Sequence, residues 1–348
     1  MKNYHQHFIL HNETIKSALQ KLNLLQDHLT LFVVEGNNKL VGTLTDGDIR
    51  RALIGDYTVY DTIDEIMNIN FIKLVQGDFN FSQILEIKKL KIALIPIVNK
   101  KVIVKKIINF EKIKSILPLE AIIMAGGEGK RLRPLTEKTP KSLLKVGNRP
   151  IIEHNIDRLA EYGVEKIYIS IKYLGNLIEE YLQNGEAKNI SISYVKEDVP
   201  LGTIGAVSLI NNLNSNYILI MNSDILTNID YEDFFMEFVS QDADMAVATI
   251  PYKVDIPYAV LETSQNLVID LKEKPTYTYY SNAGIYLIKK DLIKLIPTNS
   301  FFNATDLMEL LIKSGKKLIS YPLHSYWLDI GKHDDFEKAQ EDIKHIKF

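Results

Sequence analysis

Short apolar runs alternate with helical patterns along the second half of the chain. The apolar runs predict buried strands at 121–124, 166–171, 190–195, 217–221, 244–250 and 284–288. Apolar residues at helical spacing predict helices near 151–162, 175–184, 203–211, 231–239 and 304–314. Because strands and helices alternate, we expect an α/β fold with a mostly parallel sheet covered on both faces. Ligands of such sheets bind outside the carboxyl ends of the strands.

The first half carries a different pattern that occurs twice. Its first copy predicts a helix, two strands and a second helix, at 14–25, 31–34, 39–44 and from Thr45 onward. Its second copy is looser and predicts a helix and two strands, at 82–91, 93–98 and 102–105. The pattern changes near Pro118, so we expect two domains, a duplicated α+β domain at 1–117 and the α/β domain at 118–348.

The composition of the chain excludes several classes of partner and of cellular location. The 348 residues carry 41 basic and 44 acidic side chains, a formal net charge of −3, which argues against nucleic acid and anionic membranes as partners. The chain has no cysteine, which excludes disulfides and thiolate chemistry. No apolar run reaches the ~18 residues of a membrane span, and residues 1–7 do not resemble a signal peptide. We therefore expect a cytoplasmic protein.

The stretch Met124 to Thr136 is the most informative motif. Three glycines directly after a predicted strand let the backbone turn tightly and approach a ligand closely. Arg131 and Lys141 follow where they can hold the anionic groups that such a loop attracts. We interpret the segment as a nucleoside triphosphate site, with these loop residues binding the nucleotide: Ala125, Gly126, Gly127 and Gly129. It is not a P-loop, because no Gly-Lys-Ser/Thr sequence closes it.

A second loop, Glu197 to Ala206, follows the strand at 190–195. Pro200 and Gly202 narrow the loop, and Thr203 can cap a helix. The Glu197 carboxylate can accept hydrogen bonds from N1–H and the 2-amino group of guanine, a donor pair that thymine and uracil lack. The alternative is an acidic surface loop.

Two aspartates are candidate metal ligands. Asp224 ends a buried strand, where a carboxylate is costly unless it meets a cation. Asp329 lies between large apolar residues beside the only tryptophan. Carboxylate oxygens are the ligands that Mg²⁺ prefers. We predict that both hold Mg²⁺; the alternative for each is a capping role.

A fourth segment contains Glu-Lys-Pro followed by Asn-Ala-Gly. Glu273 and Asn282 can bind sugar hydroxyls, and Lys274 can bind a second phosphate. Glu-Lys-Pro alone is a common surface tripeptide.

These motifs, in this order, resemble the sugar-1-phosphate nucleotidyltransferase family over about residues 119–345. The resemblance implies a Rossmann-like, glycosyltransferase-A-like fold and transfer of a nucleotidyl group to a sugar 1-phosphate with Mg²⁺. It implies that Arg131 engages the triphosphate, Lys141 the reacting phosphates and Lys274 the sugar phosphate. Gly126 and Gly202 would approach base or ribose, Gly284 belongs to the sugar site, and Asp224 and Asp329 hold the metal.

Residues 1–115 resemble a tandem CBS domain pair. In that family the strand–Thr-Asp-x-Asp–helix segment binds adenine nucleotides, and the matching residues are Thr45, Asp46 and Asp48. The resemblance implies a regulatory nucleotide or a dimerising role, with a homo-oligomer as the expected assembly. The alternative is that these residues cap the following helix.

The fusion of such a pair to the transferase resembles the glucosamine-1-phosphate guanylyltransferases of legionaminic acid biosynthesis. We therefore expect GTP and α-D-glucosamine 1-phosphate as substrates. The alternatives are a mannose- or heptose-1-phosphate guanylyltransferase, a glucose-1-phosphate thymidylyl- or uridylyltransferase, and, from another class, a nucleotide-sensing subunit without turnover.

Overall fold

The computed structural model describes residues 4–25 and 28–346. Within it the chain divides into two compact units, Met1–Ile116 and Leu117–Phe348. In the described part no helix combines the length and apolarity needed to cross a membrane.

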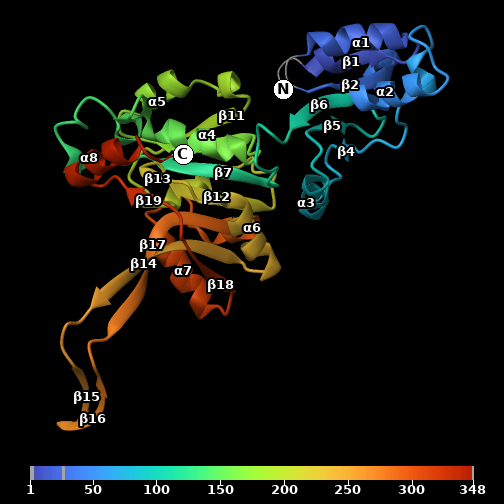
Figure 1. Ribbon diagram of the computed structural model, residues 1–348. Coiled ribbons are helices and arrows are strands. Elements are labelled where there is room, and N and C mark those ends of the chain that lie inside the picture. The colour runs from blue at the N-terminus through green and yellow to red at the C-terminus, as the bar shows by residue number, and fades with distance from the viewer. Residues whose placement is uncertain (1–3, 26–27, 347–348) are drawn as a thin grey trace. The chain divides into compact units, whose positions relative to one another are not determined.

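The first unit contains two three-stranded sheets with the same topology (Figure 1). In each sheet the central strand is parallel to one neighbour and antiparallel to the other. The elements of the first copy are β1 (Phe8–Leu10), α1 (Ile15–Leu24), β2 (Thr30–Glu35), β3 (Lys39–Thr45) and α2 (Asp46–Ile54). Those of the second are β4 (Leu74–Val75), α3 (Phe81–Lys89), β5 (Leu94–Val98) and β6 (Val104–Asn109). The repeat predicted from the sequence is therefore present, although no described helix follows β6 as α2 follows β3.

The second unit is built on one seven-stranded sheet. In spatial order its strands are β11 (Ser191–Lys196), β10 (Lys166–Ile171), β7 (Leu119–Ala125), β12 (Tyr217–Asn222), β17 (Thr276–Lys289), β14 (Met245–Asp255) and β18 (Leu318–Pro322). The first four run parallel, and β17 is antiparallel to both of its neighbours. The prediction of a mixed α/β domain with a mostly parallel sheet is confirmed.

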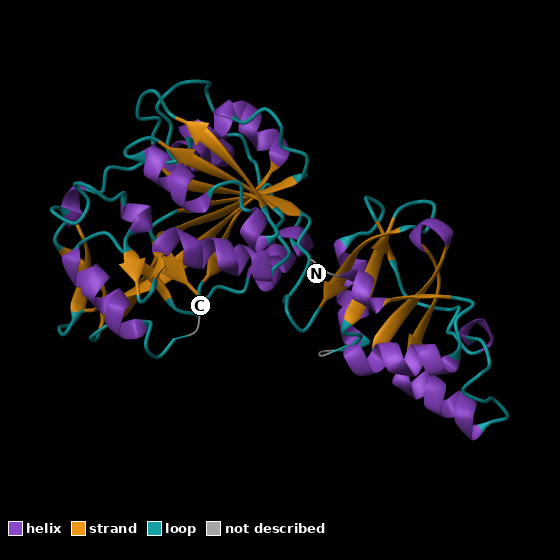
Figure 2. Cartoon of the chain, turned by 90° about the horizontal axis from the view of Figure 1, so that it is seen from above, coloured by secondary structure: helices purple, strands orange, loops and turns teal. Residues whose placement is uncertain are grey.

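Helices cover both faces of this sheet (Figure 2). They are α4 (Ile151–Glu161), α5 (Gly175–Leu182), α6 (Tyr231–Ser240), α7 (Ala304–Lys313) and α8 (His333–Asp342). On one face Leu307 and Leu311 of α7 pack with Ile122 and Ile220. Because neighbouring residues of a strand point to opposite faces, burial of both faces requires the continuous apolar run seen in β7.

One predicted helix is absent. The segment 203–211 forms only a short 3-10 helix, Gly205–Leu209, because this loop packs tightly against residues 300–302. A β-carbon on Gly205 would lie 2.7 Å from the Ser300 carbonyl oxygen, and one on Gly202 would lie 2.6 Å from that of Phe302.

The strands β14 and β17 continue beyond the sheet as a two-stranded ribbon. The hairpin β15 (Val260–Ser264) and β16 (Leu267–Lys272) lies at its end, away from the sheet (Figure 1). Two further short pairs complete the unit, β13 (Ile225–Thr227) with β19 (Trp327–Asp329) and β8 (Lys145–Val146) with β9 (Arg149–Pro150).

Candidate active site

The glycine loop leaves the carboxyl end of β7 and borders a cavity of about 610 Å³. Ala125 is the last residue of β7, and Gly129 adopts a left-handed conformation with φ of 61°. The Thr136 hydroxyl donates a hydrogen bond to the Gly129 carbonyl at 2.9 Å, which holds the far end of the loop. The cavity lining includes these residues predicted to bind the nucleotide: Ala125, Gly126, Gly127, Gly129, Arg131, Lys141, Glu197, Pro200, Gly202 and Thr203.

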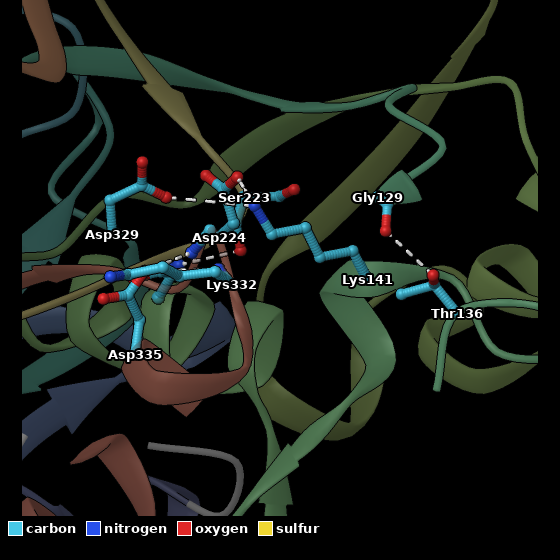
Figure 3. A network of polar contacts seen from close by, with 10 residues as sticks. Gly129, Thr136, Lys141, Ser223, Asp224, Asp329, Lys332 and Asp335 are labelled. Carbon is cyan, nitrogen blue, oxygen red and sulfur yellow. Dashed lines mark hydrogen bonds and ion pairs between the residues drawn. The ribbon is translucent and has the colours of Figure 1, made fainter. Parts of the chain in front are cut away.

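Lys141 and the two predicted metal ligands meet at one side of this cavity. The Lys141 ammonium forms an ion pair with Asp224, and its Nζ lies 3.8 Å from Asp329 Oδ1 (Figure 3). These residues come from three separate segments: the 3-10 helix Lys141–Leu143, the turn that follows β12, and β19. Strand β19 pairs with β13 so that Ile225 faces Asp329, which places both aspartates side by side.

Each of the two aspartates has one buried oxygen that accepts no hydrogen bond from the described residues. These atoms are Asp224 Oδ1 and Asp329 Oδ1. An unpaired buried carboxylate oxygen is costly, and a cation removes that cost. No group of three or more His, Cys, Asp or Glu side chains suited to a metal occurs in the described ranges. Mg²⁺ is typically bound by one or two carboxylates, and substrate phosphates supply further ligands. The two aspartates therefore fit that ion.

The charges around Asp329 also favour a bound cation. Burial raises the pKa of the Asp329 carboxyl, and the Asp224 charge raises it further, while Lys141 and Arg131 lower it. A carboxyl whose pKa is raised by burial and by a neighbouring carboxylate is one that added positive charge stabilises. This electrostatic arrangement favours a divalent cation between the two aspartates.

Arg131 lies across the cavity beside Gly331, two residues after Asp329. A β-carbon on Gly331 would lie 3.2 Å from an Arg131 guanidinium nitrogen. Any larger residue at this position would displace the guanidinium. The glycine after Asp329 therefore makes room for Arg131 in the cavity lining.

Glu197 is buried at the other side of the cavity. Its Oε1 accepts a hydrogen bond from the Ser170 hydroxyl, and its Oε2 accepts one from the Leu201 N–H at 3.2 Å. The side chain is 9% exposed and also contacts Gly126. The carboxylate is thus held in one orientation, with further lone pairs left for a ligand. The alternative of an acidic surface loop does not describe this residue.

Thr203 caps a helix that is distant in sequence. Its hydroxyl accepts a hydrogen bond from the Ala304 N–H at 2.8 Å, at the start of α7. The prediction that Thr203 can cap a helix is therefore confirmed. The Thr203 N–H also donates a hydrogen bond to the Asn303 side chain at 3.2 Å. Together the two hydrogen bonds hold the loop from Pro200 to Thr203 against the start of α7.

A second, smaller cavity of about 260 Å³ adjoins the first and shares Thr203 and Asn222 with it. Asn282, Gly284 and Asp329 line this cavity together with Trp327. The Asn282 side chain accepts from the Gly284 N–H at 2.9 Å and donates to Tyr286 at 2.9 Å. Two predicted sugar-binding residues thus lie beside the predicted metal ligands.

The structure does not bring Glu273 and Lys274 to either cavity. Both side chains are exposed and follow β16, at the base of the extended hairpin. The reason is the ribbon formed by β14 and β17, which carries this segment away from the sheet. Binding of sugar hydroxyls by Glu273 and of the sugar phosphate by Lys274 stays a prediction.

Lys172 and Asn222 also line the first cavity, although neither is predicted from the sequence as a site residue. Both could have been found from their positions, because Lys172 follows β10 and Asn222 ends β12 at the ligand-binding edge of the sheet.

In the first unit, the predicted CBS ligand residues have capping roles. Thr45 and Asp48 form a capping box at the start of α2, with Asp48 N–H donating to Thr45 Oγ1 at 3.3 Å and Thr45 N–H donating to Asp48 at 2.8 Å. Asp48 also pairs with Arg51 at 2.5 Å, and Asp46 pairs with Arg50 at 2.5 Å. The capping alternative is therefore present, and a ligand at these residues stays a prediction.

The glycine loop, the cations and the paired carboxylates thus gather at the carboxyl edge of a mostly parallel sheet, where such sheets bind their ligands. Residues 120–346 match the nucleotidyl transferase family model, so this chain belongs to that family. Residues 7–55 match the CBS domain model.

Individual relatives agree with this assignment. A D-glycero-α-D-manno-heptose 1-phosphate guanylyltransferase from Aneurinibacillus thermoaerophilus is 31% identical over 65% of this chain and 99% of that protein. A mannose-1-phosphate guanyltransferase from Debaryomyces hansenii is 31% identical over 63% of this chain, which spans 62% of that relative. A solved Bacillus anthracis structure, proposed to be a glucose-1-phosphate thymidylyltransferase, is 26% identical with a TM-score of 0.54, covering 66% of this chain and 97% of that one.

Proposed function

We propose that this protein joins a nucleoside triphosphate, GTP, to a sugar 1-phosphate and releases pyrophosphate. The observation that carries the proposal is the meeting of Lys141, Asp224 and Asp329 between the two adjoining cavities. One cavity contains the glycine loop and suits a nucleotide. The other is lined by amide and hydroxyl groups and suits a sugar. The reacting phosphates would meet where the two cavities adjoin.

The reaction needs charge neutralisation and alignment more than proton transfer. A phosphate oxygen of the sugar 1-phosphate attacks the α-phosphorus of the triphosphate and forms a new P–O bond. The bond from the α-phosphorus to the bridging oxygen breaks, and its electron pair leaves with pyrophosphate. The attacking oxygen is already ionised at neutral pH, so no general base is required. Lys141 and Arg131 lower the repulsion between the two polyanions and hold them in line.

Asp224 and Asp329 would hold Mg²⁺ beside Lys141. When bound, that ion would add positive charge to the reacting phosphates. The buried oxygens of the two aspartates that accept no hydrogen bond from the described residues support this assignment.

Two observations support guanine as the base. Glu197 is fixed as an acceptor in the cavity, which suits the N1–H and 2-amino donors of guanine. The two relatives named above from Aneurinibacillus and Debaryomyces are guanylyltransferases. A thymidylyl- or uridylyltransferase is the alternative.

The sugar has three candidates. The fusion to a CBS domain led us to expect α-D-glucosamine 1-phosphate. The names of the relatives favour heptose 1-phosphate and mannose 1-phosphate at least as strongly. The first unit would bind a regulatory nucleotide or join protomers. If the chain had lost turnover altogether, it would act as a nucleotide sensor, but it retains Arg131, Lys141, Asp224 and Asp329 together.

The test is pyrophosphate release with Mg²⁺, in which GTP, UTP, dTTP, CTP and ATP are each combined with glucosamine, mannose, heptose and glucose 1-phosphates. Turnover with GTP and one of the first three sugars supports the proposal. Turnover only with UTP or dTTP retains the reaction and refutes guanine. No turnover with any pair favours the sensor, which nucleotide binding to the whole chain would then test.

A further inference from the structure

Lys172 lies at the ligand-binding edge of the sheet, directly after the strand β10. It follows β10, just as Gly126 follows β7 and Glu197 follows β11. In the register Ile171 pairs with both Ala125 and Lys196, and the Glu197 N–H donates to the Ile171 carbonyl at 3.0 Å. The backbone of Lys172 therefore lies between the ends of β7 and β11, next to the strand positions of Gly126 and Glu197.

The Lys172 ammonium differs from those of the other two lysines that line this cavity, Lys130 and Lys141. Lys141 is paired with Asp224, and Lys130 lies 3.3 Å from Glu128. Lys172 is half-buried and lines the cavity, and its side chain makes no hydrogen bond or ion pair within residues 4–25 and 28–346. A half-buried ammonium without a protein partner is available to a ligand acceptor.

The strand order separates Lys172 from the phosphate-binding cations. The order is β11, β10, β7, β12, so Lys172 and Glu197 lie on one side of β7. Asp224, which follows the end of β12 and pairs with Lys141, lies on the other side. A nucleotide whose phosphates reach Lys141 and whose sugar passes over Gly126 would bring its base to the Lys172 side.

We propose that Lys172 is a specificity residue that donates a hydrogen bond to the 6-oxo group of guanine. Glu197 accepts from N1–H and the 2-amino group, so a donor and an acceptor stand in the order that guanine requires. Adenine presents an amino group to Lys172 and a lone pair to Glu197, and cytosine does the same, so both are rejected. This inference rests on the proposed function, because it names the base in the same nucleotide site.

Kinetics with a base analogue test the inference. The variant is Lys172→Met, and the substrates are GTP and 6-thio-GTP, which keeps N1–H and the 2-amino group but has the weaker acceptor sulfur at position 6. We expect the wild type to prefer GTP, and the variant to lose at least about tenfold of that preference in kcat/KM. Lys172→Gln, which retains a neutral donor, should keep an intermediate preference.

The matched control is Lys196→Met, which removes one charge from the neighbouring strand. Lys196 is exposed, pairs with Glu179 at 3.1 Å and does not line the cavity. It should leave the preference unchanged, and melting temperatures verify that all variants fold.

The possible outcomes distinguish a failure of the Lys172 inference from a failure of the proposed function. If Lys172→Met lowers kcat/KM for GTP and 6-thio-GTP equally, Lys172 contacts phosphate or ribose and the inference is overturned. An unchanged kcat/KM with both also overturns it. If the wild type turns over other triphosphates but not GTP, the guanine assignment itself fails, and this inference fails with it. If it turns over none, the Kd values for GTP and 6-thio-GTP replace kcat/KM in the same comparison, and equal loss of both again overturns the inference.

Discussion

A β-carbon on Gly126 would lie 2.6 Å from Glu197 Oε1, closer than any real β-carbon contact. The glycine loop and the second loop are therefore fitted to each other through these two residues. The same Oε1 accepts the Ser170 hydroxyl, so a displaced carboxylate would also lose that hydrogen bond.

Gly126→Ala should consequently displace the Glu197 carboxylate. The loss of its hydrogen bonds should reduce the free energy of unfolding by about 1–3 kcal/mol, measured by chemical denaturation. Gly127→Ala is the matched control in the same loop, because nothing lies within 4 Å of its β-carbon position. Equal destabilisation by both substitutions would contradict the close fit.

Asp224→Asn should abolish turnover while the protein remains folded. Asp224 pairs with Lys141 and has a buried oxygen free for a cation, so an amide would weaken both roles. We expect kcat to fall by about 100-fold or more, with little change in melting temperature. Pyrophosphate release at saturating Mg²⁺ measures this, and a rate equal to that of the wild type would refute the metal assignment.

Much of the second unit could be predicted because its strands are buried on both faces. The apolar run 166–171 coincides with β10, Lys166–Ile171, and the predicted strand at 217–221 is one residue shorter than β12. Parallel strands give continuous apolar runs, and these are easy to recognise.

The 14-residue strand β17 was mostly missed. The sequence predicts only its 284–288 portion, because its first seven residues pair with β14 alone and are largely exposed, with a mixed Tyr, Thr and Ser sequence. Its antiparallel direction follows from the connection through the β15–β16 hairpin, which no local pattern indicates.

In the candidate site, too, the local motifs could be predicted from the sequence, whereas the contacts between distant segments could not. The motifs of Arg131, Lys141, Glu197, Asp224 and Asp329 were recognised, and the structure places them around one cavity or at its border with the second. Their partners could not be predicted, since the contacts of Thr203 with Ala304 and of Glu197 with Ser170 join segments distant in sequence.

Asp329→Asn should stabilise the metal-free protein. Burial raises the pKa of Asp329 above its value in the unfolded chain, so the folded state binds the proton more tightly. Stability is therefore lost as pH rises from 3.8 through the folded pKa, and the ionised carboxylate remains destabilising at neutral pH. The asparagine variant should melt at a higher temperature in EDTA and gain less from added Mg²⁺.

The exposed Asp334 provides the control for that experiment, since Asp334→Asn removes a charge from a side chain that is 83% exposed. It should change neither the melting temperature in EDTA nor the gain on adding Mg²⁺. A lower melting temperature for Asp329→Asn would show that the carboxylate stabilises the fold.

His154 should make the protein sensitive to mild acid. Burial is the largest cause that lowers the pKa of His154 from 6.5, and its Nε2 lies 3.0 Å from the Val146 carbonyl. The unfolded chain therefore binds this proton first, and stability falls as pH drops below about 6.5 toward the folded pKa. Melting temperatures between pH 5 and 8 should fall less steeply in His154→Gln. The exposed His345→Gln should retain the wild-type slope, and identical slopes in all three proteins would contradict this prediction.

Lys274 tests whether the extended hairpin takes part in the reaction. If its predicted contact with the sugar phosphate forms during turnover, Lys274→Ala should raise KM for the sugar 1-phosphate by about tenfold, because a charge-assisted hydrogen bond is lost. KM for GTP should stay unchanged. Lys272→Ala is the control on the same hairpin, since Lys272 pairs with Glu262 at 2.5 Å and should affect neither constant. An unchanged KM in Lys274→Ala would mean that the hairpin stays outside the site, as the structure has it.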